Sequence, residues 1–140
     1  AGGPSARLAL RLSMALAYQP DVHVTGLHLT PEGLDDEKME DEYLYIQEII
    51  ESELGEIPDW LEIKNKPAPS ISTGIFQELK EVNYDLMIIG AGSEVFAHRY
   101  LFGALNDVII ENVDCSILIV RRYQPEAAIW LRRQIRQLEV

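Results

Sequence analysis

The sequence predicts an α/β domain built on an open, doubly wound parallel sheet. Two observations support this prediction. Apolar runs alternate with stretches of helical periodicity along the chain, and the last third has the order strand, small-residue loop, helix and strand, from DLMIIG at 85–90 to CSILIV at 115–120. Strands that alternate with helices are joined by right-handed crossovers and pair in parallel. Such a sheet binds ligands at the carboxyl ends of its strands.

The first half of the chain is predicted to begin with a helix. Pro4 suits a first helical turn, and leucine and alanine recur behind it at helical spacing. Val22–Leu29 is predicted to be a strand, which ends at the turn residues of 30–33. From Met39 to Leu54 apolar residues recur at helical spacing within an acidic stretch. We therefore expect an amphipathic helix there, with its charges facing outward.

In the second half, Trp60–Lys64 is predicted to be a short strand, and a helix follows Ser70. Gly74 lies inside that helix, where glycine costs on the order of 1 kcal/mol relative to alanine; close packing against the sheet would explain it. Asp85–Ile89 and Cys115–Val120 are continuous apolar runs, typical of strands buried on both faces. Residues 103–113 between them are predicted to be helical. The buried face of the helix after Ser70 is predicted to consist of Ile71, Ile75, Leu79 and Val82.

The predicted order starts on a helix, whereas this architecture usually starts on a strand. A missing first strand would leave its two neighbours unpaired along their backbones, so we expect that strand to be absent or to lie upstream of Ala1. Residues 1–122 are expected to form one domain and 123–140 a C-terminal amphipathic helix. The tail 121–140 holds five arginines against two glutamates. It either packs on its own domain or a dimer mate, or faces a membrane surface or a transporter.

Charge is distributed unevenly along the chain. Residues 32–59 hold 12 acidic residues and one base, Lys38, which accounts for the whole net charge of −11. Nucleic-acid binding is disfavoured, because it requires a basic surface. The acidic segment is either a solvated helix face or a docking surface for a basic partner. Cys115 has no partner for an internal disulfide and is predicted to be a buried, inert thiol, which fits a reducing, cytoplasmic location.

The loop after Gly90 is the candidate ligand site. Gly90 and Gly92 would let the backbone approach a ligand closely. Gly103–Ala104 begin a predicted helix, and the amino end of a helix attracts anions. His98 and Arg99 would add charge to a bound phosphate, Arg99 through its bidentate fork. The same stretch could equally be an ordinary connecting loop. Its spacing matches neither the glycine motif of dinucleotide-binding folds nor a Walker loop.

The segment MIIGAGSEVFAHRYLFGALNDVIIENVDCSILIV resembles the end of the universal stress protein family, in which a loop of pattern G-x2-G-x9-G-S/T links two apolar strands through a helix. The start, AGGPSARLALRLSMALA, is similar to the family's first helix, and the resemblance extends to Arg122. It implies a Rossmann-like sheet of the adenine nucleotide alpha hydrolase type. It also implies an ATP or AMP site formed by Gly90, Gly92, Ser93, Arg99, Gly103 and Ala104.

Three departures from the family pattern imply that this nucleotide site is degenerate. Ser93 stands where the second glycine of the loop would be, Ala104 replaces the Ser/Thr hydroxyl, and Ala1 replaces an aspartate near the adenosine. The lost hydroxyl removes a hydrogen bond to a charged acceptor. A Cβ at position 93 is compatible with the loop only if its φ is negative.

The Ala-Gly-Gly-Pro start resembles family members that are fused behind membrane transporters such as chloride channels and cation/proton antiporters. The resemblance therefore implies a non-catalytic, homodimeric regulatory domain, located in the cytoplasm or on the cytosolic face of a membrane protein. Two alternatives remain: a ligand-free dimerisation module or stand-alone stress protein, and a slow ATPase. Catalysis has little support, because His23 and His28 lie in the first predicted strand and no carboxylate pair stands next to the loop after Gly90.

Overall fold

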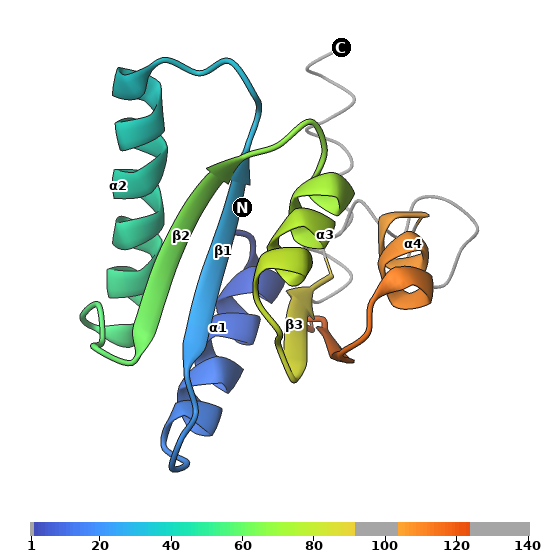
Figure 1. Cartoon of the computed structure of the whole chain (residues 1–140). Coiled ribbons are helices and arrows are strands. Elements are labelled where there is room, and N and C mark those ends of the chain that lie inside the picture. Colours follow the sequence, from blue (N-terminus) through green and yellow to red (C-terminus); the bar gives the residue numbers. More distant parts are fainter. Residues whose placement is uncertain (1, 92–103, 124–140) are drawn as a thin grey trace.

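Helices and strands alternate in the computed structural model, which describes residues 2–91 and 104–123 (Figure 1). In those ranges the predicted elements are confirmed, with ends that differ by at most three residues. The predicted C-terminal helix in 123–140 lies almost entirely outside the described residues. The elements are α1 (Pro4–Ala17), β1 (Val24–Thr30), α2 (Asp36–Leu54), β2 (Leu61–Pro67), α3 (Ile71–Glu81), β3 (Leu86–Gly90), α4 (Ala104–Asn112) and β4 (Ser116–Val120).

Local sequence explains where the helices begin and end. Asp35 caps α2 by accepting a hydrogen bond from the Lys38 N–H at 2.9 Å. Gly55 ends that helix in the left-handed region, with φ of 87°. Ser70 caps α3 by accepting from the Thr73 N–H at 3.2 Å. The N-cap of α1 is Gly3, which has no side-chain acceptor to offer the first helical turn.

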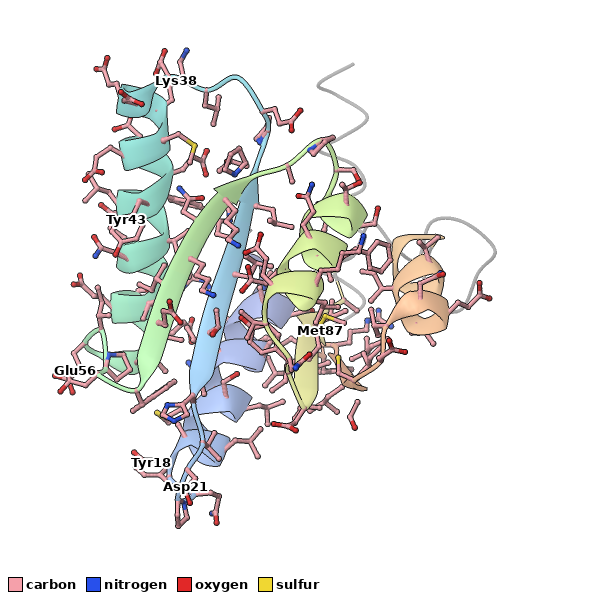
Figure 2. The ribbon with its side chains drawn as sticks, viewed as in Figure 1. Tyr18, Asp21, Lys38, Tyr43, Glu56 and Met87 are labelled. Atoms are coloured by element: carbon pink, nitrogen blue, oxygen red, sulfur yellow. The ribbon has the colours of Figure 1, made fainter. Side chains whose placement is uncertain are left out.

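The strands form two separate parallel pairs in the described part of the chain. β1 pairs with β2 in the register Val24↔Leu61 to Thr30↔Pro67, and β3 pairs with β4 in the register Leu86↔Ser116 to Gly90↔Val120. β1 and β3 both run upward in Figure 1, so their carboxyl ends point toward the same edge. In Figure 2, Lys38 lies toward this edge, whereas Tyr18 and Asp21 mark the turn at the opposite end.

Helices cover both faces of these strands, so the fold is doubly wound, as predicted. α1 packs against β3 and β4, and α2 packs against β1 and β2 and also against α1. α3 lies on the other face of β1 and contacts α4. The prediction that Gly74 allows α3 to pack closely on the sheet is confirmed. A Cβ at Gly74 would lie 2.6 Å from a methyl group of Leu29 and 2.8 Å from the Cβ of Ala68.

Burial is less complete than the sequence predicts. Ile71, predicted on the buried face of α3, is 54% exposed. Leu86 and Leu118 belong to runs predicted to be buried on both faces, yet they are 39% and 40% exposed. The physical reason is that each sheet has only two strands in the described ranges, so apolar side chains beside the free strand sides are left uncovered. The buried apolar residues are Ala9, Ile49, Ile50, Leu61, Ala68, Ala91, Ile109 and Val120.

A buried carboxylate joins α3 to β2. Glu78 is 2% exposed, and its Oε1 accepts hydrogen bonds from the Lys64 ammonium at 2.8 Å and the Tyr84 hydroxyl at 2.6 Å. Its Oε2 has an ion-pair contact with Lys66 but no well-aligned hydrogen bond. Burial raises the pKa of Glu78, but Lys64, Lys66 and Tyr84 together outweigh it and lower the pKa to about 2. The carboxylate is therefore ionised throughout the physiological range.

We predict that Glu78→Gln destabilises the fold above pH 5 and flattens its acid dependence. The pKa of Glu78 falls from an ordinary value of 4.5 to about 2 on folding, so the carboxylate stabilises the fold above pH 4.5, and this contribution is lost as the pH falls toward 2. The ionised carboxylate contributes on the order of 3 kcal/mol to the free energy of unfolding. Urea unfolding between pH 2 and 7 measures it. The exposed Glu81 supplies the control, since Glu81→Gln should change the unfolding free energy by less than about 1 kcal/mol. Parallel pH curves for Glu78→Gln and the unmodified chain would contradict the prediction.

Candidate functional site at the amino end of helix α1

Three segments that are distant in the sequence meet at the amino end of α1. Ser5 lies in the first turn and is 7% exposed. Its hydroxyl accepts a hydrogen bond at 3.2 Å from the N–H of Arg122, just after β4. The N–H of Ala91, just after β3, donates to the Val120 carbonyl at 2.8 Å. The ends of β3 and β4 and the first turn of α1 thus form one junction at the carboxyl edge of the sheet.

Gly90 is required by the packing of this junction. A Cβ at Gly90 would lie 2.5 Å from the carbonyl carbon of Ser5 and 2.5 Å from the amide nitrogen of Ala6. These are backbone atoms, which cannot rotate away as a flexible side chain would. Its φ is not in the left-handed region, so the close approach of α1, and not an unusual backbone conformation, demands glycine here. The first turn of α1 therefore fills the space that the missing side chain of Gly90 leaves.

Two arginines fix the start of α1 against α2. Arg7 donates through Nε to the Gly2 carbonyl at 3.0 Å and through Nη1 to Oε1 of Glu53 at 3.0 Å. Arg11 donates through Nε to Oε2 of Glu53 at 2.7 Å. The hydrogen bonds from Arg7 and Arg11 lower the pKa of Glu53, whose side chain is only 8% exposed. The ionised carboxylate therefore holds the first turns of α1 in place.

A shallow hollow of about 80 Å³ lies beside the junction, bordered by Leu8, Arg11 and Arg122. A water molecule occupies roughly 30 Å³ of liquid. The hollow therefore has room for a few waters or a small ion, and it does not by itself form a nucleotide pocket.

Two of the six predicted ligand residues lie in the described part of the chain. Gly90 is at the junction, and Ala104 begins α4, which connects β3 to β4 and therefore starts at the same edge of the sheet (Figure 1). Helices α1 and α4 thus both begin at the carboxyl edge of β3 and β4. The other four predicted ligand residues lie outside the described residues: Gly92, Ser93, Arg99 and Gly103. Their contact with a ligand stays a prediction.

Sequence reasoning missed the part that α1 has in this junction. The Ser5 hydroxyl and the Arg122 N–H are 117 positions apart, so no local pattern reveals their contact. The available signal was a small polar residue, Ser5, directly after Gly-Gly-Pro in the first turn of the helix.

The histidine and cysteine side chains of the described ranges lie away from the junction. His28 contacts Glu42 of α2 at 2.9 Å through Nε2. Cys115 is only partly buried, where the sequence predicts a buried thiol, because it precedes β4 at the end of the strand opposite the junction. Among the described residues no three or more His, Cys, Asp or Glu side chains are grouped as a metal site. The helices that are described there are too short or too polar to cross a membrane.

Comparison with solved structures identifies the fold. The structure of a universal stress protein from Archaeoglobus fulgidus matches with a TM-score of 0.57 and 19% identity, over 84% of this chain and 90% of that one. The crystal structure of the hypothetical protein PH0823 matches with a TM-score of 0.58 and 16% identity, over 87% of this chain and 91% of that one. No protein-family model and no curated protein matches the sequence. The chain therefore has the universal stress protein fold, as its sequence resemblance predicts.

We predict that Gly90→Ala lowers the free energy of unfolding by about 1–3 kcal/mol, because the added methyl group collides with the backbone of α1. Gly26→Ala is the matched control within a strand, since a Cβ at Gly26 would make an ordinary contact of 3.5 Å with Leu61. Urea unfolding of both variants measures the difference. A loss for Gly90→Ala no larger than that for Gly26→Ala would contradict the packing of α1 on the end of β3.

Proposed function

We propose that this chain is a non-catalytic regulatory domain that binds an adenine nucleotide, ATP or AMP, at the carboxyl edge of β3 and β4. The observation that carries this proposal is that α1 and α4 both begin at this edge, on either side of the end of β3. Helix amino ends present free N–H groups and a partial positive charge to phosphate. The likeness of the fold to a universal stress protein also supports it.

One residue of the proposed site is expected to lower its affinity for the nucleotide. In the proposal the backbone N–H groups of Gly103 and Ala104 bind phosphate, with Arg99 as a cationic partner. Ala104 lacks the hydroxyl that the family pattern has at this position. A hydrogen bond to a charged group contributes about 1.5–3 kcal/mol, so the loss weakens binding by roughly ten- to 150-fold.

The regulated protein, in this proposal, is an ion or solute transporter that is attached to the domain or binds it on the cytosolic side. The resemblance of the Ala-Gly-Gly-Pro start to transporter-fused domains supports this. The charge distribution is also consistent with a basic partner. Ten of the 12 acidic residues in 32–59 are exposed, whereas Glu42 is hydrogen-bonded to His28 of β1 and Glu53 is engaged in ion pairs with α1.

We predict that ATP and AMP bind weakly to the unmodified chain and about tenfold or more tightly to Ala104→Ser, because the new hydroxyl restores a hydrogen bond to phosphate. Gly103→Val should abolish binding. Isothermal titration with ATP, AMP and a cyclic nucleotide measures these affinities.

The matched control for Ala104→Ser is Ala104→Cys, which adds a group of similar size with a weak donor and should leave the affinity within about threefold. Equal affinities for the unmodified chain and Ala104→Ser, or no binding to either, would overturn the proposed site. Release of phosphate from ATP at a rate above that in buffer alone would favour a slow ATPase instead, provided that Arg99→Ala abolishes this release.

A ligand-free assembly module is the second candidate, and the exposure of apolar side chains near β4 favours it. Leu118 on β4 is 40% exposed, and Val108 and Ile110 on α4 are each 43% exposed. In the described ranges β4 pairs with β3 on one side only. An edge strand with unpaired backbone groups is a template for pairing with another chain.

We predict that the chain forms a dimer at tens of micromolar. Leu118→Arg should raise the dissociation constant of this dimer at least tenfold, because a charge would be buried at the interface. Leu44→Arg is the control, since Leu44 is 48% exposed on the remote helix α2. Sedimentation velocity over a concentration series measures both variants. A monomer at all concentrations, or equal effects of the two substitutions, contradicts assembly through β4.

A further inference from the structure

The outer face of α2, on the side away from the sheet, carries acidic side chains without ion-pair partners. In residues 2–91 and 104–123 no ion pair engages any of them. The five acids of this face are all exposed: Glu37, Glu40, Asp41, Glu48 and Glu51. Like charges three or four positions apart on a helix repel each other and lower its stability, as Glu37 and Asp41 or Glu48 and Glu51 do here. A cationic segment along this face would therefore stabilise α2.

An apolar side chain lies at the centre of the same outer face. Leu44 is 48% exposed, and three of its neighbours one turn away are Glu40, Asp41 and Glu48. Tyr45 borders the face and is 47% exposed. α2 forms one outer side of the molecule (Figure 1). Single exposed apolar residues are common on protein surfaces, but here two adjacent large ones lie among unpaired acids. A segment that fits this face has apolar side chains at its centre and basic ones at its rim.

Residues 128–138 of this chain have that composition. They hold Arg132, Arg133 and Arg136 and no acidic residue. The sequence predicts that they belong to an amphipathic helix, and helical spacing places the arginines outside its apolar seam. The seam consists of Ala128, Leu131, Ile135 and Leu138. Both the apolar and the charged features of this segment thus complement the outer face of α2.

The described part of the chain ends close to α2. The Arg122 N–H donates to the Ser5 hydroxyl at 3.2 Å, and Ser5 follows Gly2 by three residues, which span at most about 10 Å. A Cβ at Gly2 would lie 3.1 Å from the hydroxyl of Tyr45, near the middle of α2. Residues 123–127 can extend over about 17 Å, more than the diameter of about 10 Å of a helix. Residues 128–138 can therefore reach the outer face of α2 in the same chain.

We propose that residues 128–138 dock as an amphipathic helix on the outer face of α2 of the same chain. The apolar seam covers Leu44 and Tyr45, and the three arginines neutralise acids on either side of Leu44. The docked segment occupies the surface that a basic partner would use, so such a partner must displace it. Only this competition rests on the proposed regulatory function, because the docking itself requires neither a partner nor a nucleotide.

Paramagnetic relaxation in the full 140-residue chain, measured without nucleotide, tests the docking. Cys115→Ser removes the native thiol, and Gln137→Cys carries a nitroxide outside the apolar seam. The amide signals of the outer face of α2, from Glu37 to Glu51, should weaken by about twofold or more relative to the reduced label. The amide signals of Val108–Asn112 on α4 should keep their intensity, because α4 lies on the opposite side of the molecule from α2 (Figure 1).

Charge reversal tests whether the arginines and the acids recognise each other. Arg132→Glu with Arg133→Glu should abolish the weakening of the α2 signals, and so should Glu40→Arg with Asp41→Arg. All four substitutions together should restore it, because the opposite charges again face each other. Glu56→Arg with Asp59→Arg is the matched control. These two acids are exposed beyond the end of α2, so their reversal changes the net charge equally and should leave the docking unchanged.

A mixed sample distinguishes docking within one chain from docking between copies. It combines isotope-labelled chain without the nitroxide and unlabelled chain with it, and the α2 signals should keep their intensity. Weakening in this mixture as large as in the single chain would assign the face to a second copy and overturn the proposal. Unweakened α2 signals in the chain that carries both the nitroxide and the native charges would also overturn it, as would weakening that neither charge reversal changes.

Discussion

The structure depends on the contact between the first turn of α1 and the end of β3. The described strands form two pairs with no shared hydrogen bonds, so the helices must hold the pairs together. α1 is suited to do so, because it packs on β3 and β4 and is also bound to α2, which covers β1 and β2. The absence of a Cβ at Gly90 allows backbone to meet backbone at this point.

Ion pairs between layers complement this contact. Glu53 joins α2 to α1 through Arg7 and Arg11, and Glu78 joins α3 to β2 through Lys64 and Lys66. Each carboxylate is nearly inaccessible to solvent and has at least two charged partners, so its ionised form is favoured despite its burial. Removing the partners would leave a buried carboxylate uncompensated, which is costly, so these pairs favour one placement of α2 against α1 and of α3 against β2.

The sequence predicted the described elements well, because each has a local cause. Apolar runs, helical periodicity, the caps Asp35 and Ser70 and the terminating Gly55 all act within a few residues. The burial of particular side chains was predicted less well, as the exposure of Ile71 and Leu118 illustrates, because burial depends on which strands are neighbours. Of the candidate site, Gly90 and the start of α4 were predicted from glycine placement. The contribution of Ser5 could not be, since its partner lies at the far end of the chain.

The candidate ligand edge borders the amino end of α1, so the contacts that hold this end in place bear on how it would bind an anion. A ligand bound by helix amino ends gains affinity when those ends are held in the binding geometry beforehand, because less conformational freedom is lost on binding. In this chain the first turns of α1 are held by the close approach at Gly90, by the hydrogen bond of the Ser5 hydroxyl and by the ion pairs of Arg7 and Arg11 with Glu53. Under the proposed function, ligand binding would by linkage stabilise these same contacts by the free energy that they add to binding.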